Sequence, residues 1–180
     1  MRSNESKIAI FLLALLLSFG LLMGGQKLYN SNLLEKPVIN DLLKLNYVEK
    51  VTITKEAGVY QDAVQIKQAG NIKTEYKEID SLIKAKIRGK QYKLELLDTR
   101  NQALENELQK MELGIYEAIA KNNYLSLDQR FAVMAAQDHF DYRLQIDEKR
   151  LYLQITSGDH FLYEIFTRSE AVDSQLDKGV

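Results

Sequence analysis

Residues Tyr142–Phe166 read YRLQIDEKRLYLQITSGDHFLYEIF, and apolar side chains alternate along three parts of this stretch. The alternating residues are Tyr142, Leu144 and Ile146, then Leu151, Leu153 and Ile155, and finally Phe161, Tyr163 and Ile165. A period of two residues is typical of strands that bury one face. Short polar turns at Asp147–Lys149 and Ser157–Asp159 separate the three runs. The stretch therefore predicts a meander of three antiparallel strands.

Two helices are predicted immediately before the meander. Apolar residues recur at helical spacing in the first of them, at Leu104, Leu108, Met111, Ile115 and Ile119. We expect Asp98 or Thr99 to cap its start, with Thr99 and Gln102 forming a capping box, and Asn122-Asn123 to end it. Ser126 and Gln129 predict a second capping box, at the start of a shorter helix that presents Leu127, Phe131, Met134 and Ala135.

The segment between residues 37 and 96 mixes strand and helix signals. Pro37 favours the first turn of a short helix, where its missing N–H costs nothing. Alternation predicts strands at Val48–Thr54, Val64–Lys67 and Tyr92–Leu96, with turns at Ala57-Gly58 and at residues 69–71. Residues 72–76 also alternate, whereas helical spacing follows, so we expect a strand into Tyr76 and a helix from Lys77.

The order of these elements predicts the fold class. Strands and helices come in runs rather than as alternating βαβα units, which is typical of an α+β fold. We expect one domain, residues 37–167, in which a mostly antiparallel sheet packs on helices and ends in the three-stranded meander. Residues 168–180 lose all periodicity, and we expect a flexible tail there.

An unbroken apolar run occupies Ile8–Gly25. Its 18 residues approach the length that crosses a bilayer as a helix, and its eleven Leu, Ile and Phe residues favour insertion by about 3 to 7 kcal/mol. Arg2 and Lys7 precede it, which predicts a cytoplasmic tail at residues 1–7 and an extracytoplasmic domain after a spacer at residues 26–36. A cleaved signal peptide is the alternative, but no good small-x-small site follows the run.

Composition excludes several classes of function. The chain has no cysteine, so disulfides, thiolate metal sites and thiol nucleophiles are ruled out. Its net charge of −1 gives no broad basic surface for nucleic acid. The sequence has neither a phosphate-binding glycine loop nor a nucleophile elbow, and we predict no cofactor.

The two histidines, His139 and His160, are weak candidates for a metal site or a hydrolase. Both precede predicted meander strands and would lie at the same end of the sheet, about 9 to 10 Å apart across one intervening strand. The simpler interpretation places His139 at a helix C-terminus and His160 in an ordinary turn. We therefore predict neither catalytic residues nor a metal site.

Aromatic and apolar residues also fall on the second face of the meander. This face is more apolar than a solvent-exposed surface needs to be, because it carries Tyr152, Leu162 and Phe166. It is therefore either a second buried side or a contact surface. We predict an interaction patch there, in a non-catalytic, single-pass protein that is anchored in the bilayer through Ile8–Gly25. Its partners would be other envelope proteins or a second copy. The alternatives are a small-ligand-binding module with a pocket between sheet and helices, and a hydrolase that uses His139 or His160.

Overall fold

The computed structural model describes Leu15, Ser18 and residues 34–87 and 89–168. The predicted membrane segment Ile8–Gly25 lies, apart from Leu15 and Ser18, outside the described residues. So do the predicted tails, apart from Arg168, and most of the spacer. Within the described part of the chain, no helix is both long and apolar enough to span a bilayer.

The first half of the fold is a three-stranded sheet, sheet A, with two helices. Its elements are α2 (Lys36–Leu42), β1 (Val48–Glu56), β2 (Val59–Ile66), α3 (Ile72–Ile87) and β3 (Tyr92–Leu97). The strand order is β1-β2-β3, with β1 antiparallel and β3 parallel to β2. Ala57 and Gly58 both have positive φ, which suits a tight hairpin turn. The predicted Pro37 helix, hairpin turn and strands are present, although β2 begins earlier than predicted.

Helix α3 corrects the prediction of a strand at residues 72–76. The helix begins at Ile72, and Ile72, Tyr76, Ile79, Ile83 and Ile87 are all buried. These residues lie on one helical face, which covers the inner face of sheet A. Alternation over only five residues fits the start of such a face as well as a strand, and burial against sheet A selects the helix.

The second half of the fold is another three-stranded sheet, sheet B, with a pair of helices. Its elements are α4 (Gln102–Lys121), α5 (Tyr124–Asp138), β4 (Asp141–Ile146), β5 (Arg150–Ser157) and β6 (His160–Thr167). The three strands form the predicted antiparallel meander in the order β4-β5-β6.

The helix caps in this half differ from the predicted ones. Asn101 caps α4, since its side chain accepts from the Leu104 N–H at 3.0 Å, and Asn123 caps α5. Both predicted capping boxes, at Thr99 and at Ser126, were therefore wrong. Asn122 adopts the left-handed conformation that ends α4, as predicted.

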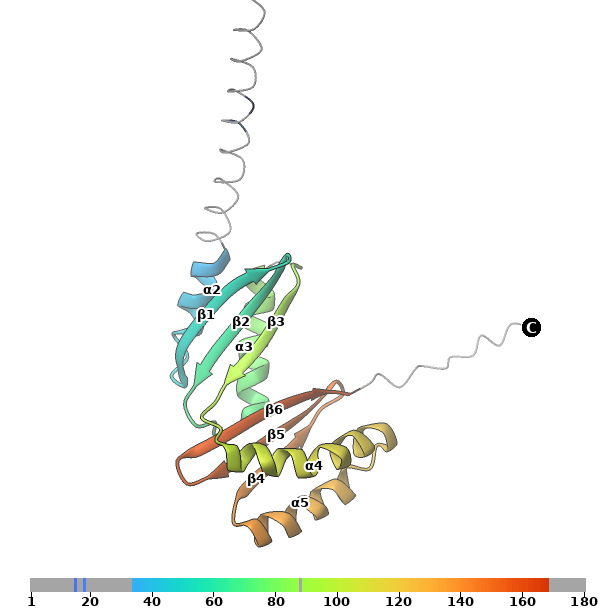
Figure 1. The fold of residues 1–180 in the computed structure, drawn as a ribbon. Helices are drawn as coiled ribbons and strands as arrows, with labels where there is room; N and C mark the ends of the chain where they lie inside the picture. The colour runs from blue at the N-terminus through green and yellow to red at the C-terminus, as the bar shows by residue number, and fades with distance from the viewer. Residues whose placement is uncertain (1–14, 16–17, 19–33, 88, 169–180) are drawn as a thin grey trace, which may run out of the picture.

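The α+β fold class is confirmed, but the described strands form two sheets rather than the single sheet that we expected. Figure 1 shows sheet A above sheet B, with α3 behind sheet A and the α4–α5 pair beside sheet B. One face of sheet B packs on α4 and α5. The buried residues of that core are Leu104, Met111, Ile115, Ala118, Leu127, Phe131, Phe140, Leu151, Leu153, Ile155 and Leu162.

The other face of sheet B packs into another cluster of buried residues, which we call the first core because α2, α3 and sheet A supply most of it. Tyr152, Phe161 and Tyr163 are buried together with residues of α2, α3 and sheet A. The Tyr163 hydroxyl accepts from the Ala69 N–H at 2.6 Å, and the rings of Tyr76 and Tyr152 meet edge to face at 5.8 Å. Sheet B is therefore enclosed between two cores, and polar as well as apolar contacts join the halves of the fold.

Candidate functional site

The predicted interaction patch is not an exposed surface. Tyr152 and Leu162 are both 0% exposed, and Phe166 packs against the core beneath α4. The strand register also separates them, because Tyr152 pairs with Ile165 while Phe166 pairs with Leu151. Tyr152 thus faces the first core, and Leu162 and Phe166 face the second. Of the two interpretations given for these residues, the structure supports the second buried side.

The two histidines lie at the same end of sheet B, as predicted, and both are exposed. His139 is the left-handed residue that ends α5. The Nδ1 atom of His160 lies 2.8 Å from the Thr99 carbonyl oxygen. One of the two ring nitrogens is therefore engaged in a contact within the fold. No group of three or more potential ligands that could hold a metal ion occurs among the described residues. The arrangement therefore gives no support to a metal site at these histidines.

A groove of about 510 Å³ opens between β3 and β6, where the two sheets meet. Figure 1 shows β3 descending toward β6 at this junction. The residues that line the groove are Tyr76, Lys93, Leu94, Glu95, Leu96, Leu97, Asp98, Arg100, Tyr163, Glu164 and Ile165. Both strands are edge strands of their sheets, since β3 pairs with β2 and β6 with β5 among the described strands.

One end of the groove is closed by the segment that follows β3. The Thr99 N–H donates to the Phe161 carbonyl at 3.2 Å, and the Thr99 hydroxyl accepts from the Phe161 N–H at 3.1 Å. Asp98 Oδ2 accepts from the Tyr163 N–H at 2.9 Å, and Arg100 Nη2 donates to the Tyr163 carbonyl at 3.2 Å. These four bonds satisfy the outward backbone groups at the start of β6, as an additional strand would.

The rest of the groove exposes backbone groups of β3. Because the Gln91 carbonyl accepts from the Tyr60 N–H at 3.0 Å, the odd-numbered residues of β3 point toward β2. The N–H and C=O groups of the even-numbered residues, including Leu94 and Leu96, therefore point away from β2 and into the groove. On β6, Phe161 and Tyr163 are bonded to the segment after β3. The next residue whose backbone N–H and C=O point away from β5 is Ile165. Unpaired strand edges are templates for pairing with another chain.

Side chains alternate along β3 between an apolar and a charged face. Leu94 and Leu96 face α3 and pack on the first core, whereas Lys93 and Glu95 are exposed on the outer face of sheet A. Arg100 is already paired, with Asp98 at 2.7 Å and Glu164 at 2.9 Å. The hydrogen bonds to Asp98, more than those to Glu164, raise the pKa of Arg100. The exposed charges at the open part of the groove are thus those of Lys93 and Glu95.

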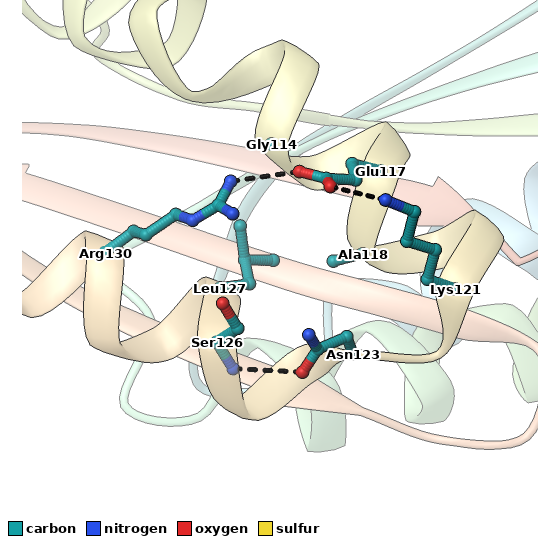
Figure 2. Close-up of a pocket in the computed structure, with 8 residues that line it drawn as sticks. All are labelled: Gly114, Glu117, Ala118, Lys121, Asn123, Ser126, Leu127 and Arg130. Carbon is teal, nitrogen blue, oxygen red and sulfur yellow. Dashed lines mark hydrogen bonds and ion pairs between the residues drawn. The ribbon is translucent and has the colours of Figure 1, made fainter.

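The other cavities are weaker candidates. Figure 2 shows a site at the α4–α5 corner, where Glu117 lies between Arg130 at 3.0 Å and Lys121 at 2.8 Å. Its cavity of about 20 Å³ has room for little more than a water molecule. A cavity of about 230 Å³ lies between α4 and α5, and others of about 260 and 250 Å³ border the junction of the two sheets. None of these four, nor the groove, lies between a sheet and the long helix α4.

One buried carboxylate lies near the groove, on the covered face of sheet A. Asp62 pairs in register with Leu94 and is 1% exposed. Neither of its carboxylate oxygens has a hydrogen-bond partner among the described residues. Burial raises the pKa of Asp62 from 3.8 to about 6.

No protein-family model, curated protein or solved structure matches this chain. The function is therefore inferred from the geometry of the groove. Sequence reasoning identified β3 as a strand but not the groove, because a single strand pattern does not reveal which edge stays unpaired. The available signal was the change from apolar to charged side chains along residues 93–96.

Proposed function

We propose that this protein is a non-catalytic interaction module of the cell envelope, anchored by a single membrane span. Its folded part binds a segment of a partner protein in the groove between β3 and β6. The observation that carries this proposal is the unpaired edge of β3 along a 510 Å³ groove at the junction of two packed sheets. Binding sites often occur at such junctions between structural units.

The membrane anchor rests on the sequence of Ile8–Gly25 and on the positive residues before it. A spacer of about ten residues reaches at most roughly 35 Å when extended, so the groove would work close to the bilayer. Anchoring raises the local concentration of membrane-bound partners, and a weak interface then suffices. A periplasmic or cell-surface reporter fused after Val180 tests this topology, and activity of a cytoplasmic reporter there would contradict it.

The charges at the junction favour binding of a partner segment over a small-molecule enzyme site. The groove walls are joined by the Arg100–Asp98–Glu164 cluster, in which one guanidinium pairs with two carboxylates. The charged side chains left exposed, those of Lys93 and Glu95, lie on the outer face of β3. Such an arrangement suits recognition by backbone pairing and charge complementarity.

Site-specific photo-cross-linking in intact cells tests the proposal. A photoreactive amino acid replaces Lys93 in one variant and Thr54 in the control. Thr54 lies in the same cross-strand row of sheet A, through Gln61, but two strands away from the groove. We expect one discrete adduct with an envelope protein from position 93 and none from position 54. Equal labelling from both positions, or no adduct from position 93, would contradict the proposal.

A further inference from the structure

The volume of the groove limits the size of the segment that it can hold. A strand in a packed sheet occupies about 160 Å³ per residue, given a rise of about 3.4 Å, a strand spacing of about 4.8 Å and a sheet spacing of about 10 Å. The 510 Å³ groove therefore holds about three residues of one extended strand. A single strand fits this space better than the edge of a second three-stranded sheet, which argues against a second copy.

Backbone pairing sets the alternation of the bound strand. A strand that bonds to the outward groups of Leu94 and Leu96 has side chains that alternate in step with those of β3. Two of its residues lie beside Leu94 and Leu96, on the apolar side that Tyr76 and Ile165 also line. The residue between them lies beside Glu95, on the exposed face.

Charge favours a basic residue at that middle position. The groove is lined by two basic and three acidic residues and so has a net charge of −1. Lys93 and Glu95 cancel, so this net charge belongs to the cluster in which the Arg100 guanidinium pairs with the carboxylates of Asp98 and Glu164. Glu95 lies directly beside the middle position of the bound strand, whereas Lys93 lies two residues along β3. Opposite charges on directly neighbouring strands stabilise pairing, and like charges oppose it.

We infer that the partner presents an extended apolar–basic–apolar segment that pairs with the open edge of β3. This inference rests on the proposed function and specifies its ligand. The pattern holds for either direction of the bound strand, because the three central residues are symmetric about the basic one.

Peptide binding to the full-length protein in detergent micelles tests the inference. The probe is Gly-Thr-Val-Lys-Val-Thr-Gly-amide with a fluorescent label in place of an acetyl cap on its N-terminus, and the matched peptide carries Glu in place of Lys. We expect the Lys peptide to bind the wild type about fivefold more tightly than the Glu peptide. The Glu95→Lys variant should reverse this preference, because residue 95 is exposed and its charge alone changes sign.

A second pair of variants isolates the backbone contact. Leu94→Ala and Leu94→Pro both shorten the side chain, but only proline removes the N–H that points into the groove. We expect the alanine variant to bind the Lys peptide more weakly than wild type, because Leu94 flanks the bound strand, and the proline variant to lose a further fivefold or more relative to the alanine variant. Far-UV circular dichroism checks that both variants fold. In the wild type, hydrogen exchange at the Leu94 and Leu96 amides should slow when the peptide is added.

Equal binding of the two peptides, no reversal by Glu95→Lys, or no binding up to the millimolar range would overturn the inference. So would unchanged amide exchange at Leu94 and Leu96 at saturating peptide. If cross-linking from position 93 still gives its discrete adduct, such a result leaves the proposed function standing and removes only the strand-pairing ligand. Loss of the adduct as well would remove both.

Discussion

Replacement of Asp62 by asparagine should stabilise the protein at neutral pH. Asp62 is enclosed beneath α3 without a hydrogen-bond partner among the described residues, and burial raises its pKa from 3.8 to about 6. In the unfolded chain the carboxyl ionises at its ordinary pKa. Between about pH 4 and pH 6, Asp62 therefore keeps its proton in the folded state but has lost it in the unfolded state.

The pKa difference sets the size and the sign of the effect. A difference of this size corresponds to about 3 kcal/mol, at about 1.4 kcal/mol per tenfold change in proton affinity. Because the folded state binds more protons, the contribution is fully favourable below about pH 4 and is lost as the pH rises to about 6. Asparagine does not ionise and resembles the protonated acid. The variant should therefore match wild type near pH 4 and exceed it by about 3 kcal/mol at pH 7.

Urea unfolding of wild type and Asp62→Asn at pH 4, 5, 6 and 7, followed by far-UV circular dichroism, measures this difference. Asp41→Asn is the control. The pKa of Asp41 is lowered to about 2, first by the hydrogen bond from Lys44 and then by that from Lys86. Its contribution is therefore complete above about pH 5, where this control should run parallel to wild type. A stability difference between wild type and Asp62→Asn that stays constant from pH 4 to pH 7 would refute the reasoning.

Three further predictions concern stability. Tyr163→Phe leaves the Ala69 N–H without its 2.6 Å acceptor and should lower the free energy of unfolding by about 1 to 3 kcal/mol in urea titrations. Asn101→Ala removes the α4 cap and should cost about 1 kcal/mol, measured as a lower thermal midpoint. Leu162→Ser should cost at least about 3 kcal/mol because the side chain is fully buried, whereas Leu113→Ser, at a site 83% exposed, should change stability by less than about 0.5 kcal/mol. Similar small losses at both leucines would contradict the assignment of Leu162 to the core.

Local signals predicted the individual elements more successfully than their arrangement. The meander was predictable because three alternating runs are separated by short polar turns, which specify hairpins without reference to the rest of the chain. The end of α4 was predictable for a similar reason, since asparagine tolerates the left-handed conformation. Its start was not, because Thr99 and Asn101 are both good capping residues. Thr99 instead bonds to Phe161, which is 62 positions further along the chain.

The candidate site could not be predicted because it depends on long-range packing. Alternation showed that both faces of the meander were apolar, but not whether the second face met another core or a partner. The answer came from residues such as Ala69, whose N–H bonds to Tyr163 from 94 positions away. The groove arises because this packing places β3 beside β6, while the outer edge of β3 pairs with no described strand and that of β6 is bonded only at its start.

The burial of sheet B between two cores makes the halves of the chain mutually dependent. Without the second half, Tyr76 and Ala69 would lose the aromatic side chains that now cover them. Without the first half, the Tyr152 and Tyr163 side of the meander would meet water. A protease nick between β3 and α4 should consequently yield two pieces that remain associated under native conditions, and neither piece should serve as an independent building block in a fusion protein.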